Sequence, residues 1–194
     1  MFNYPLILAS GSPRRLALLK GAGFNVRVII ANVDESLDMA ETDFGKAAMM
    51  LAKRKARKVI SRVADSATLL LAADTLVVLD GKVLGKPVDL NEAKKTLQIL
   101  SGKRHEVITG VYLSYGLHER LFNVSTSVYF SKLTDEMINY YVETFKPLDK
   151  AGAYAIQEWI GMVGIEKING DYFNVVGLPM QAVVQSIKEL LLLD

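Results

Sequence analysis

Short apolar runs alternate with longer amphipathic stretches along the 194 residues of this chain. The run from Leu6 to Ala9 is too short for a helix and is typical of a buried strand. The run from Leu69 to Leu79 is the strongest strand signal, and Asp80-Gly81 after it predicts a hairpin turn that pairs Val83-Leu84 back onto it. Further strands are predicted at residues 24–30, 105–115, 121–130, 161–168 and 173–176.

Helical patterns fall between the strands. Ser12 and Pro13 predict a helix start, because a capping hydroxyl precedes a proline at the first helical position, and Gly21 predicts its end. A second helix is predicted from about Thr42, its expected cap, to Val63. Its apolar stripe has the spacing of one helix face and comprises Phe44, Ala48, Leu51, Ala52 and Val59. Other helices are predicted at 91–100, 134–144 and 178–193.

This alternation of strands and helices, with added hairpins, predicts an α/β fold with a mixed central sheet flanked by helices. The length suffices for a substantial core, and neither an internal repeat nor a linker is visible. Residues 1–194 are therefore interpreted as a single domain. If the chain forms two lobes, the pattern places their boundary near residues 65–70 or 145–150.

Composition narrows the functional classes. The net charge of +2 gives no reason to expect binding to nucleic acid or to a membrane surface, so the positive charge for an anionic substrate must be concentrated in a site. The absence of cysteine excludes disulfides, zinc fingers and thiol catalysis. No signal-peptide pattern opens the chain, and no apolar run reaches the ~20 residues that span a bilayer. We therefore expect a cytoplasmic protein.

The first candidate site is the turn from the first strand into the first helix. A helix start presents backbone N–H groups and a positive dipole end, and Gly11 lets a ligand approach the backbone. Ser10, Arg14 and Arg15 lie in the same turn, where arginines are unfavourable unless an anion offsets the dipole. The pattern favours a phosphate site, and the alternative is an ordinary capped helix with solvated arginines.

Charged residues at three further places suggest a catalytic centre. Asp74 interrupts the apolar strand, and a buried carboxylate is costly unless it is paired or bound to a metal; the alternative is a carboxylate hydrogen-bonded to backbone at a bend. Lys55 shares the apolar stripe of the second helix, where a lysine either extends its amine to solvent or meets an anion. Glu35, in an acidic loop, could join Asp74 in supplying the oxygen ligands that magnesium or manganese takes beside phosphates.

The remaining candidates are weaker as bare patterns. Lys86 is held by the stiff Pro87 after the hairpin, although a surface turn is the simpler interpretation. The segment from Asp149 to Gln157 has small residues and a tyrosine before a lone glutamine, which could form a wall that recognises a base. His105 forms no ligand pair or triad and is interpreted as structural or surface.

Taken together, these segments resemble the Maf family over nearly the whole chain. The family's opening motif, L-A-S-x-S-P-R-R, matches residues 8–15, and its G-A-D-T strand corresponds to 72–75, which read Ala-Ala-Asp-Thr. Its K-P turn matches 86–87, and its N/S-V-V-G-L-P ending matches 174–179. Its block D-K-A-G-A-Y-G-I-Q-G matches 149–158, with Ala155 and Glu158 in place of two glycines. Trp159, in the same glycine region, and Met50, where arginine is common, are further departures.

The resemblance implies a nucleoside triphosphate pyrophosphatase that uses a divalent cation, Mg or Mn, on a fold like that of the inosine triphosphate pyrophosphatases, with two lobes and a cleft. Asp74 matches the proposed proton acceptor. Phosphate- or metal-site positions are matched by Ser10, Arg14, Arg15, Glu35, Lys55 and Lys86, with Glu35 and Asp74 as the metal ligands.

The positions associated with substrate choice, Arg14, Thr75 and Gln157, resemble the dTTP/UTP branch. The 7-methyl-GTP branch has Trp, Gln and Glu at these positions. The expected partner is a nucleoside triphosphate, with neither nucleic acid nor a membrane, and a homodimer stays open. Since the family is linked with arrest of septum formation, the alternative function is a nucleotide-binding regulator of cell division that lacks catalysis.

Overall fold

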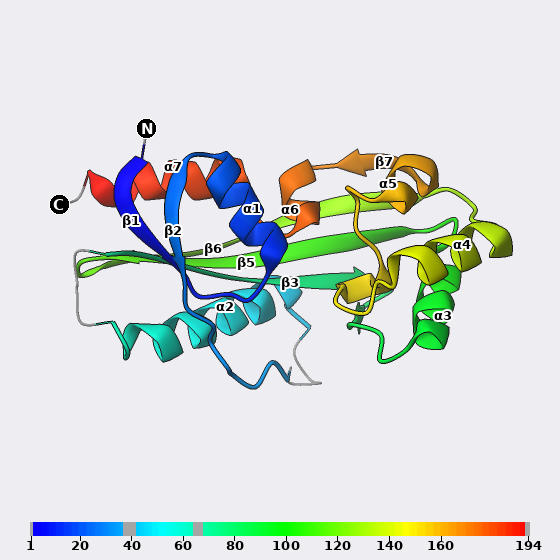
Figure 1. The fold of residues 1–194 in the computed structure, drawn as a ribbon, viewed down its shortest axis with the longest axis horizontal. Helices are drawn as coiled ribbons and strands as arrows, with labels where there is room; N and C mark the ends of the chain where they lie inside the picture. The colour runs from blue at the N-terminus through cyan, green and yellow to red at the C-terminus, as the bar shows by residue number, and fades with distance from the viewer. Residues whose placement is uncertain (1, 37–41, 64–67, 193–194) are drawn as a thin grey trace. The chain divides into compact units, whose positions relative to one another are not determined.

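The computed structural model describes residues 2–36, 42–63 and 68–192, and within them it contains a seven-stranded mixed sheet (Figure 1). The strand order is β2-β1-β3-β5-β6-β7, and β4 pairs with β3. The strands are β1 (Phe2–Leu8), β2 (Phe24–Val28), β3 (Leu69–Leu79), β4 (Lys82–Leu84), β5 (Arg104–Tyr115), β6 (His118–Phe130) and β7 (Ile165–Asn169). The helices are α1 (Pro13–Gly21), α2 (Phe44–Ile60), α3 (Leu90–Leu100), α4 (Asp135–Phe145), the 3-10 turn η1 (Ala151–Ala153), α5 (Trp159–Gly164), α6 (Tyr172–Val176) and α7 (Met180–Leu191).

The predicted α/β class and most predicted elements are confirmed. β3 has its predicted bounds, and β4 pairs with it antiparallel, with Val78 opposite Val83. The connecting Asp80 and Gly81 have φ of 49° and 73°, the left-handed backbone that a tight hairpin turn requires. Thr134 caps α4 as predicted, its hydroxyl accepting from the Met137 N–H at 3.2 Å.

Three local predictions were wrong. The cap of α2 is Asp43 rather than Thr42, since the Asp43 carboxylate accepts from the Lys46 N–H at 2.9 Å. Residues 159–164 form α5, so that β7 begins only at Ile165, and residues 172–176 form α6 instead of a strand. Short apolar runs do not distinguish a strand from a buried helical turn, and here the Asp171 carboxylate accepts from the Phe173 N–H at 2.7 Å and favours the helical start.

The chain folds into two compact units whose boundaries differ from those predicted. The first unit comprises residues 1–74, 109–124 and 177–194, and the second comprises 75–108 and 125–176. Boundaries near 65–70 or 145–150 were therefore wrong. The chain passes between the units inside β3, β5 and β6, and strand periodicity continues through such a crossing without a break, so it leaves no linker to detect.

The first unit has apolar clusters on both faces of its strands. One includes Leu8 and Leu71 with Val183 and Ile187 of α7. The other includes Ile7, Leu70 and Ala72 with Ala52, Ala56 and Val59 of α2. Since side chains alternate along a strand, Asp74 shares the face of Leu70 and Ala72, toward α2, and Thr75 points to the opposite face.

Helix α2 lies against the sheet at very short range. A Cβ added to Gly110 of β5 would come within 2.2 Å of the backbone carbon of Ala48. The predicted stripe of α2 is confirmed, because Ala48, Leu51, Ala52 and Val59 are buried, and Lys55 is buried with them. None of the helices in the described ranges is long and apolar enough to cross a bilayer.

The second unit has its own core, which includes side chains of α3, α4 and the segment 153–160. His105 is 1% exposed within it, with Nε2 at 2.7 Å from the Tyr154 hydroxyl and its ring stacked on Phe130. This placement confirms a structural histidine. Burial lowers the pKa of His105 to about 4, because the imidazolium would lose its hydration.

The buried His105 should make the protein less stable in mild acid. Its folded-state pKa lies below the unfolded value of about 6.5, so only the unfolded chain takes up a proton as the pH falls from about 6.5 to 4. Between pH 7 and 4.5 this linkage removes about 2 kcal/mol from the free energy of unfolding. Urea denaturation of wild type and His105→Gln at both pH values measures it, and the wild type should lose more stability by about that amount. Equal losses in the two proteins would contradict the assignment.

Candidate functional site

The turn between β1 and α1 is ordered by its two serines. Ser10 is 7% exposed, and its hydroxyl oxygen accepts from the Ser12 N–H at 3.2 Å. Ser12 is the predicted cap of α1, with its hydroxyl accepting from the Arg15 N–H at 3.4 Å. The preceding backbone is tied to the sheet, since the Ala9 N–H donates to the Leu71 carbonyl at 2.8 Å. The loop therefore presents the N-terminus of α1 in a fixed position.

Arg15 is buried and bonded to protein atoms, whereas Arg14, one residue earlier, is partly exposed. The Arg15 Nε donates to the Gly177 carbonyl at 2.8 Å, and Nη1 donates to the Ala73 carbonyl at 2.8 Å and to the Ser10 hydroxyl at 3.2 Å. Burial lowers the pKa of Arg15, and the nearby Asp74 acts in the opposite direction. The guanidinium thus joins the turn before α1, strand β3 and the segment before α7. Its contact in β3 is Ala73, the residue directly before Asp74.

A lysine joins the two acidic candidates. The Lys55 ammonium pairs with the Asp74 carboxylate, and its Nζ lies 2.7 Å from Glu35 Oε1. The side chains of Lys55 and Asp74 are 9% and 11% exposed, whereas that of Glu35 is 49% exposed. The lysine therefore meets anions rather than extending to solvent, which settles the alternative that the sequence left open. We name Glu35, Lys55 and Asp74 the carboxylate–lysine trio.

The loop that carries Glu35 is fastened to α2. The Arg54 guanidinium donates to the Asp34 carbonyl at 2.5 Å. The Asp34 carboxylate accepts from the Ser36 N–H at 2.9 Å and from its hydroxyl at 2.8 Å, and these bonds lower the pKa of Asp34. Both neighbours of Glu35 are therefore held in place. Residues 37–38 of the predicted acidic loop lie outside the described residues.

Two members of the trio, Glu35 and Asp74, carry the oxygen ligands that a hard divalent cation takes. Two carboxylates converge on the ammonium of Lys55, and magnesium is commonly bound by one or two carboxylates together with substrate phosphates. Across the described parts of the chain, His, Asp and Glu form no group of three or more that could hold an ion. Glu35 and Asp74 could thus hold a cation only with further oxygen ligands, such as phosphate oxygens.

The lysine turn of the second unit is tied to the segment that follows α4. The exposed Lys86 lies between Gly85 and the buried Pro87, and the Gly85 carbonyl accepts from the Gly152 N–H at 3.1 Å. Gly152 has φ of 70°, and a Cβ there would come within 2.9 Å of Val77 Cγ1. Glycine is therefore required at this contact.

Gln157 and its neighbour Glu158 differ sharply in environment. Gln157 is exposed, directly after the buried Ile156. Glu158 accepts from the Tyr141 hydroxyl at 2.5 Å and lies 3.3 Å from the buried Lys150 ammonium. This departure from the Maf motif is thus bonded into the unit's core. Of the other departures, Met50 is 50% exposed.

The structure brings together five of the predicted residues in the first unit, namely Ser10, Arg15, Glu35, Lys55 and Asp74. Thr75, Lys86 and Gln157 belong to the second unit. Sequence reasoning missed Lys150 and Tyr141 as partners of Glu158. A lysine within an otherwise small and apolar segment was the available signal for Lys150, whereas nothing in the pattern of α4 distinguished Tyr141.

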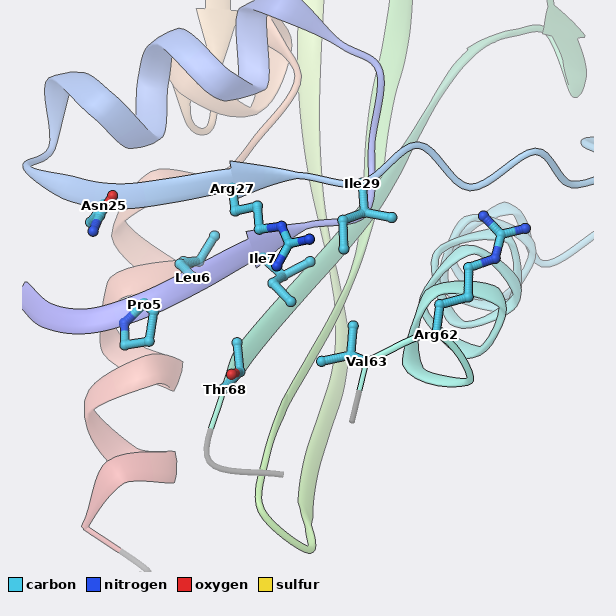
Figure 2. Close-up of a pocket in the computed structure, with 9 residues that line it drawn as sticks. All are labelled: Pro5, Leu6, Ile7, Asn25, Arg27, Ile29, Arg62, Val63 and Thr68. Carbon is cyan, nitrogen blue, oxygen red and sulfur yellow. The ribbon is translucent and has the colours of Figure 1, made fainter. Parts of the chain in front are cut away.

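A cavity of about 330 Å³ lies elsewhere in the first unit (Figure 2). It is lined by Pro5, Leu6, Ile7, Asn25, Arg27, Ile29, Arg62, Val63 and Thr68. None of the predicted site residues is among these. The cavity is therefore separate from the carboxylate–lysine trio.

Comparison with known proteins places these residues in a family. A solved structure, the Ham1 protein of Staphylococcus aureus, is 13% identical, covers 65% of this chain and 71% of its own, and superposes with a TM-score of 0.42, which is too low to support an argument. A dTTP/UTP pyrophosphatase of Cytophaga hutchinsonii is 47% identical over 98% of this chain and 86% of the relative. The protein of the same name from Christiangramia forsetii is 46% identical over 97% of this chain and 95% of its own length. The model of the family described as Maf-like protein matches residues 5–190, and the chain belongs to this family.

Proposed function

We propose that this protein is a metal-dependent pyrophosphatase that converts dTTP and UTP to the monophosphate and pyrophosphate. The observation that carries the proposal is the carboxylate–lysine trio, in which the buried Asp74 of the family motif meets Lys55 and Glu35. A binding protein has no need of a buried carboxylate beside its phosphate-binding turn, whereas hydrolysis needs a proton acceptor. The names of the relatives support the substrates.

Asp74 is the proposed proton acceptor. It takes a proton from water while the water oxygen bonds to the α-phosphorus, and the bond from that phosphorus to the β-phosphate bridging oxygen breaks, releasing pyrophosphate. Lys55 compensates the charge of Asp74 in the free protein. A divalent cation held by Glu35, Asp74 and phosphate oxygens would neutralise substrate charge and orient the water. Lys55, which pairs with both carboxylates, would also compensate phosphate charge beside such a cation.

The remaining residues divide between binding and support. The start of α1, with Ser10 and Arg14, is the proposed phosphate contact, because helix N-termini favour anions. Arg15 donates its bonds to Ala73, Gly177 and Ser10, so we assign it chiefly to holding this turn in place. We assign Lys86 to phosphate binding and Gln157 to base recognition, as the family motifs imply. Thr75 acts with Gln157 in base choice.

Cleavage should occur between the α and β phosphates. With UTP or dTTP as substrate and magnesium or manganese present, the products should be the monophosphate and pyrophosphate in equal amounts. Separation of the nucleotides by ion-exchange chromatography, with a parallel assay for pyrophosphate, checks this. Release of orthophosphate and the diphosphate would contradict the proposal, and binding of nucleotide without turnover would favour the regulatory alternative.

Asp74→Asn should remove most turnover and leave the fold intact. The amide keeps the shape of the side chain but loses its negative charge and its proton acceptor, so kcat should fall by about 10²–10⁴. Asp80→Asn is a matched control, because Asp80 lies in the exposed hairpin turn with φ of 49°, which asparagine tolerates. Turnover within about threefold of the wild type in Asp74→Asn would exclude a central role for Asp74.

Gln157→Glu should change base preference. A glutamine amide offers both a donor and an acceptor to the N–H and C=O edge of uracil or thymine, whereas a carboxylate favours the donor-rich edge of guanine. Wild type should therefore prefer UTP and dTTP over 7-methyl-GTP. In the variant, the kcat/KM values for UTP and dTTP should exceed that for 7-methyl-GTP by a smaller factor. The measurement is kcat/KM for the three substrates with both proteins. Unchanged ratios, or a wild-type preference for 7-methyl-GTP, would show the assignment to be wrong.

A further inference from the structure

A closed polar network surrounds Glu158 in the second unit. Its Oε2 accepts from the Tyr141 hydroxyl at 2.5 Å, and its Oε1 lies 3.3 Å from the Lys150 Nζ. The same Tyr141 oxygen accepts from the Ala155 N–H at 3.2 Å, and Lys150 also pairs with Asp149 at 2.7 Å. We name Tyr141, Lys150 and Glu158, with the Ala155 N–H, the Glu158 clamp.

The clamp is anchored in the core of its unit. Tyr141 is fully buried on α4 and stacks on Phe145 with ring centroids 5.0 Å apart. The Lys150 side chain is 9% exposed, and that of Glu158 is 23% exposed. A buried ammonium and a buried phenol both require acceptors, and the Glu158 carboxylate serves both. Its side chain therefore cannot turn to solvent without depriving two buried groups of a partner.

The clamp fixes the backbone on both sides of Gln157. On one side, the Ala155 N–H is bonded to Tyr141, and the Ala155 carbonyl accepts from the Glu158 N–H at 3.1 Å. On the other side, the Glu158 carbonyl accepts from the Gly161 N–H at 2.9 Å at the start of α5. Gln157 is the exposed residue within this turn.

We propose that the Glu158 clamp is a positioning device for Gln157 that fixes the orientation in which its amide meets a pyrimidine base. The inference rests on the proposed function and extends it to discrimination between two pyrimidines. Uracil has a carbonyl at the position where cytosine has an amino group. Uracil therefore needs the N–H of the glutamine amide as a donor, and cytosine needs the amide oxygen as an acceptor. With the backbone held, Gln157 meets the base edge from one fixed Cα position, and with the turn loosened that position can shift between the registers that suit uracil and cytosine.

Loosening the clamp should therefore lower selectivity for UTP over CTP. Sites that depend on oriented hydrogen bonds reject a mismatched partner strongly, and small displacements remove much of that effect. In Glu158→Gln the ion pair with Lys150 is lost, although the side chain keeps its length. We expect the ratio of kcat/KM for UTP to that for CTP to fall roughly tenfold. The kcat/KM for UTP should fall because its KM rises, and the kcat/KM for CTP should rise.

The test compares kcat/KM for UTP and CTP in wild type, Glu158→Gln and Tyr141→Phe. Tyr141→Phe removes the hydroxyl that bonds both Glu158 and the Ala155 N–H, so it should shift the ratio in the same direction. Glu143→Gln is the matched control, because this glutamate also lies on α4 but pairs with Lys94 outside the clamp, and its ratio should equal that of wild type.

The outcomes separate the clamp from a purely structural role. Destabilisation alone would reduce the active fraction and lower both substrates equally, leaving the UTP:CTP ratio unchanged, and that result in Glu158→Gln would overturn the inference. Because Glu158→Gln keeps the side-chain length, its UTP:CTP ratio of kcat/KM tests the inference even if Tyr141→Phe fails to fold. A wild type that releases no pyrophosphate from UTP would instead overturn the proposed function and, with it, this inference.

Discussion

A carboxylate in the middle of an apolar strand is the constraint on which the first unit depends. Asp74 follows five buried residues of β3 and is itself 8% exposed, a position where an unpaired charge is strongly unfavourable. Removing Lys55 would leave Asp74 as an uncompensated buried charge, which typically destabilises a protein by about 3–5 kcal/mol. Lys55 supplies the counter-charge, so helix α2 must lie on the face of the sheet toward which Asp74 points.

That requirement explains the small residues between α2 and the sheet. Ala48, Ala52 and Ala56 are fully buried on the helix face, and Gly110 leaves room where β5 meets the backbone of Ala48. Larger side chains here would separate the helix from the strands and withdraw Lys55 from Asp74. Arg15 acts beside the same carboxylate, since its bond to the Ala73 carbonyl connects the start of α1 to the strand. The proposed phosphate-binding turn and the proposed base are thus held by one set of contacts.

In the second unit, the segment 149–158 contacts the neighbours of both candidate residues, Lys86 and Gln157. Gly152 bonds to Gly85 beside Lys86, and Lys150 pairs with Glu158 beside Gln157. Residues 149–158 therefore support both the lysine turn and the glutamine turn. The glutamate at position 158, where the family motif has glycine, adds bonds to this support without placing a charge at the exposed Gln157.

Local periodicity was sufficient for most of the fold and for part of the site. Strand alternation, the stripe of α2, the Ser12 cap and the Asp80-Gly81 turn depend on residues within a few positions of each other, and the structure confirms them. The same stripe placed Lys55 on the buried face of its helix. Where short-range signals were ambiguous, as at residues 161–164, the prediction of a strand was wrong.

Only the tertiary structure decided which groups meet. Asp74 lies 19 positions from Lys55, and Arg15 reaches carbonyls that are 58 and 162 positions away. Periodicity indicates which face a side chain occupies but carries no information about the element that packs on that face. Patterns within the chain were therefore sufficient to identify most elements, their buried faces and the candidate residues. The packing of distant segments decided that Lys55 pairs with Asp74 and that the buried Arg15 donates to the Ala73 and Gly177 carbonyls, because those pairings arise only where such segments come into contact.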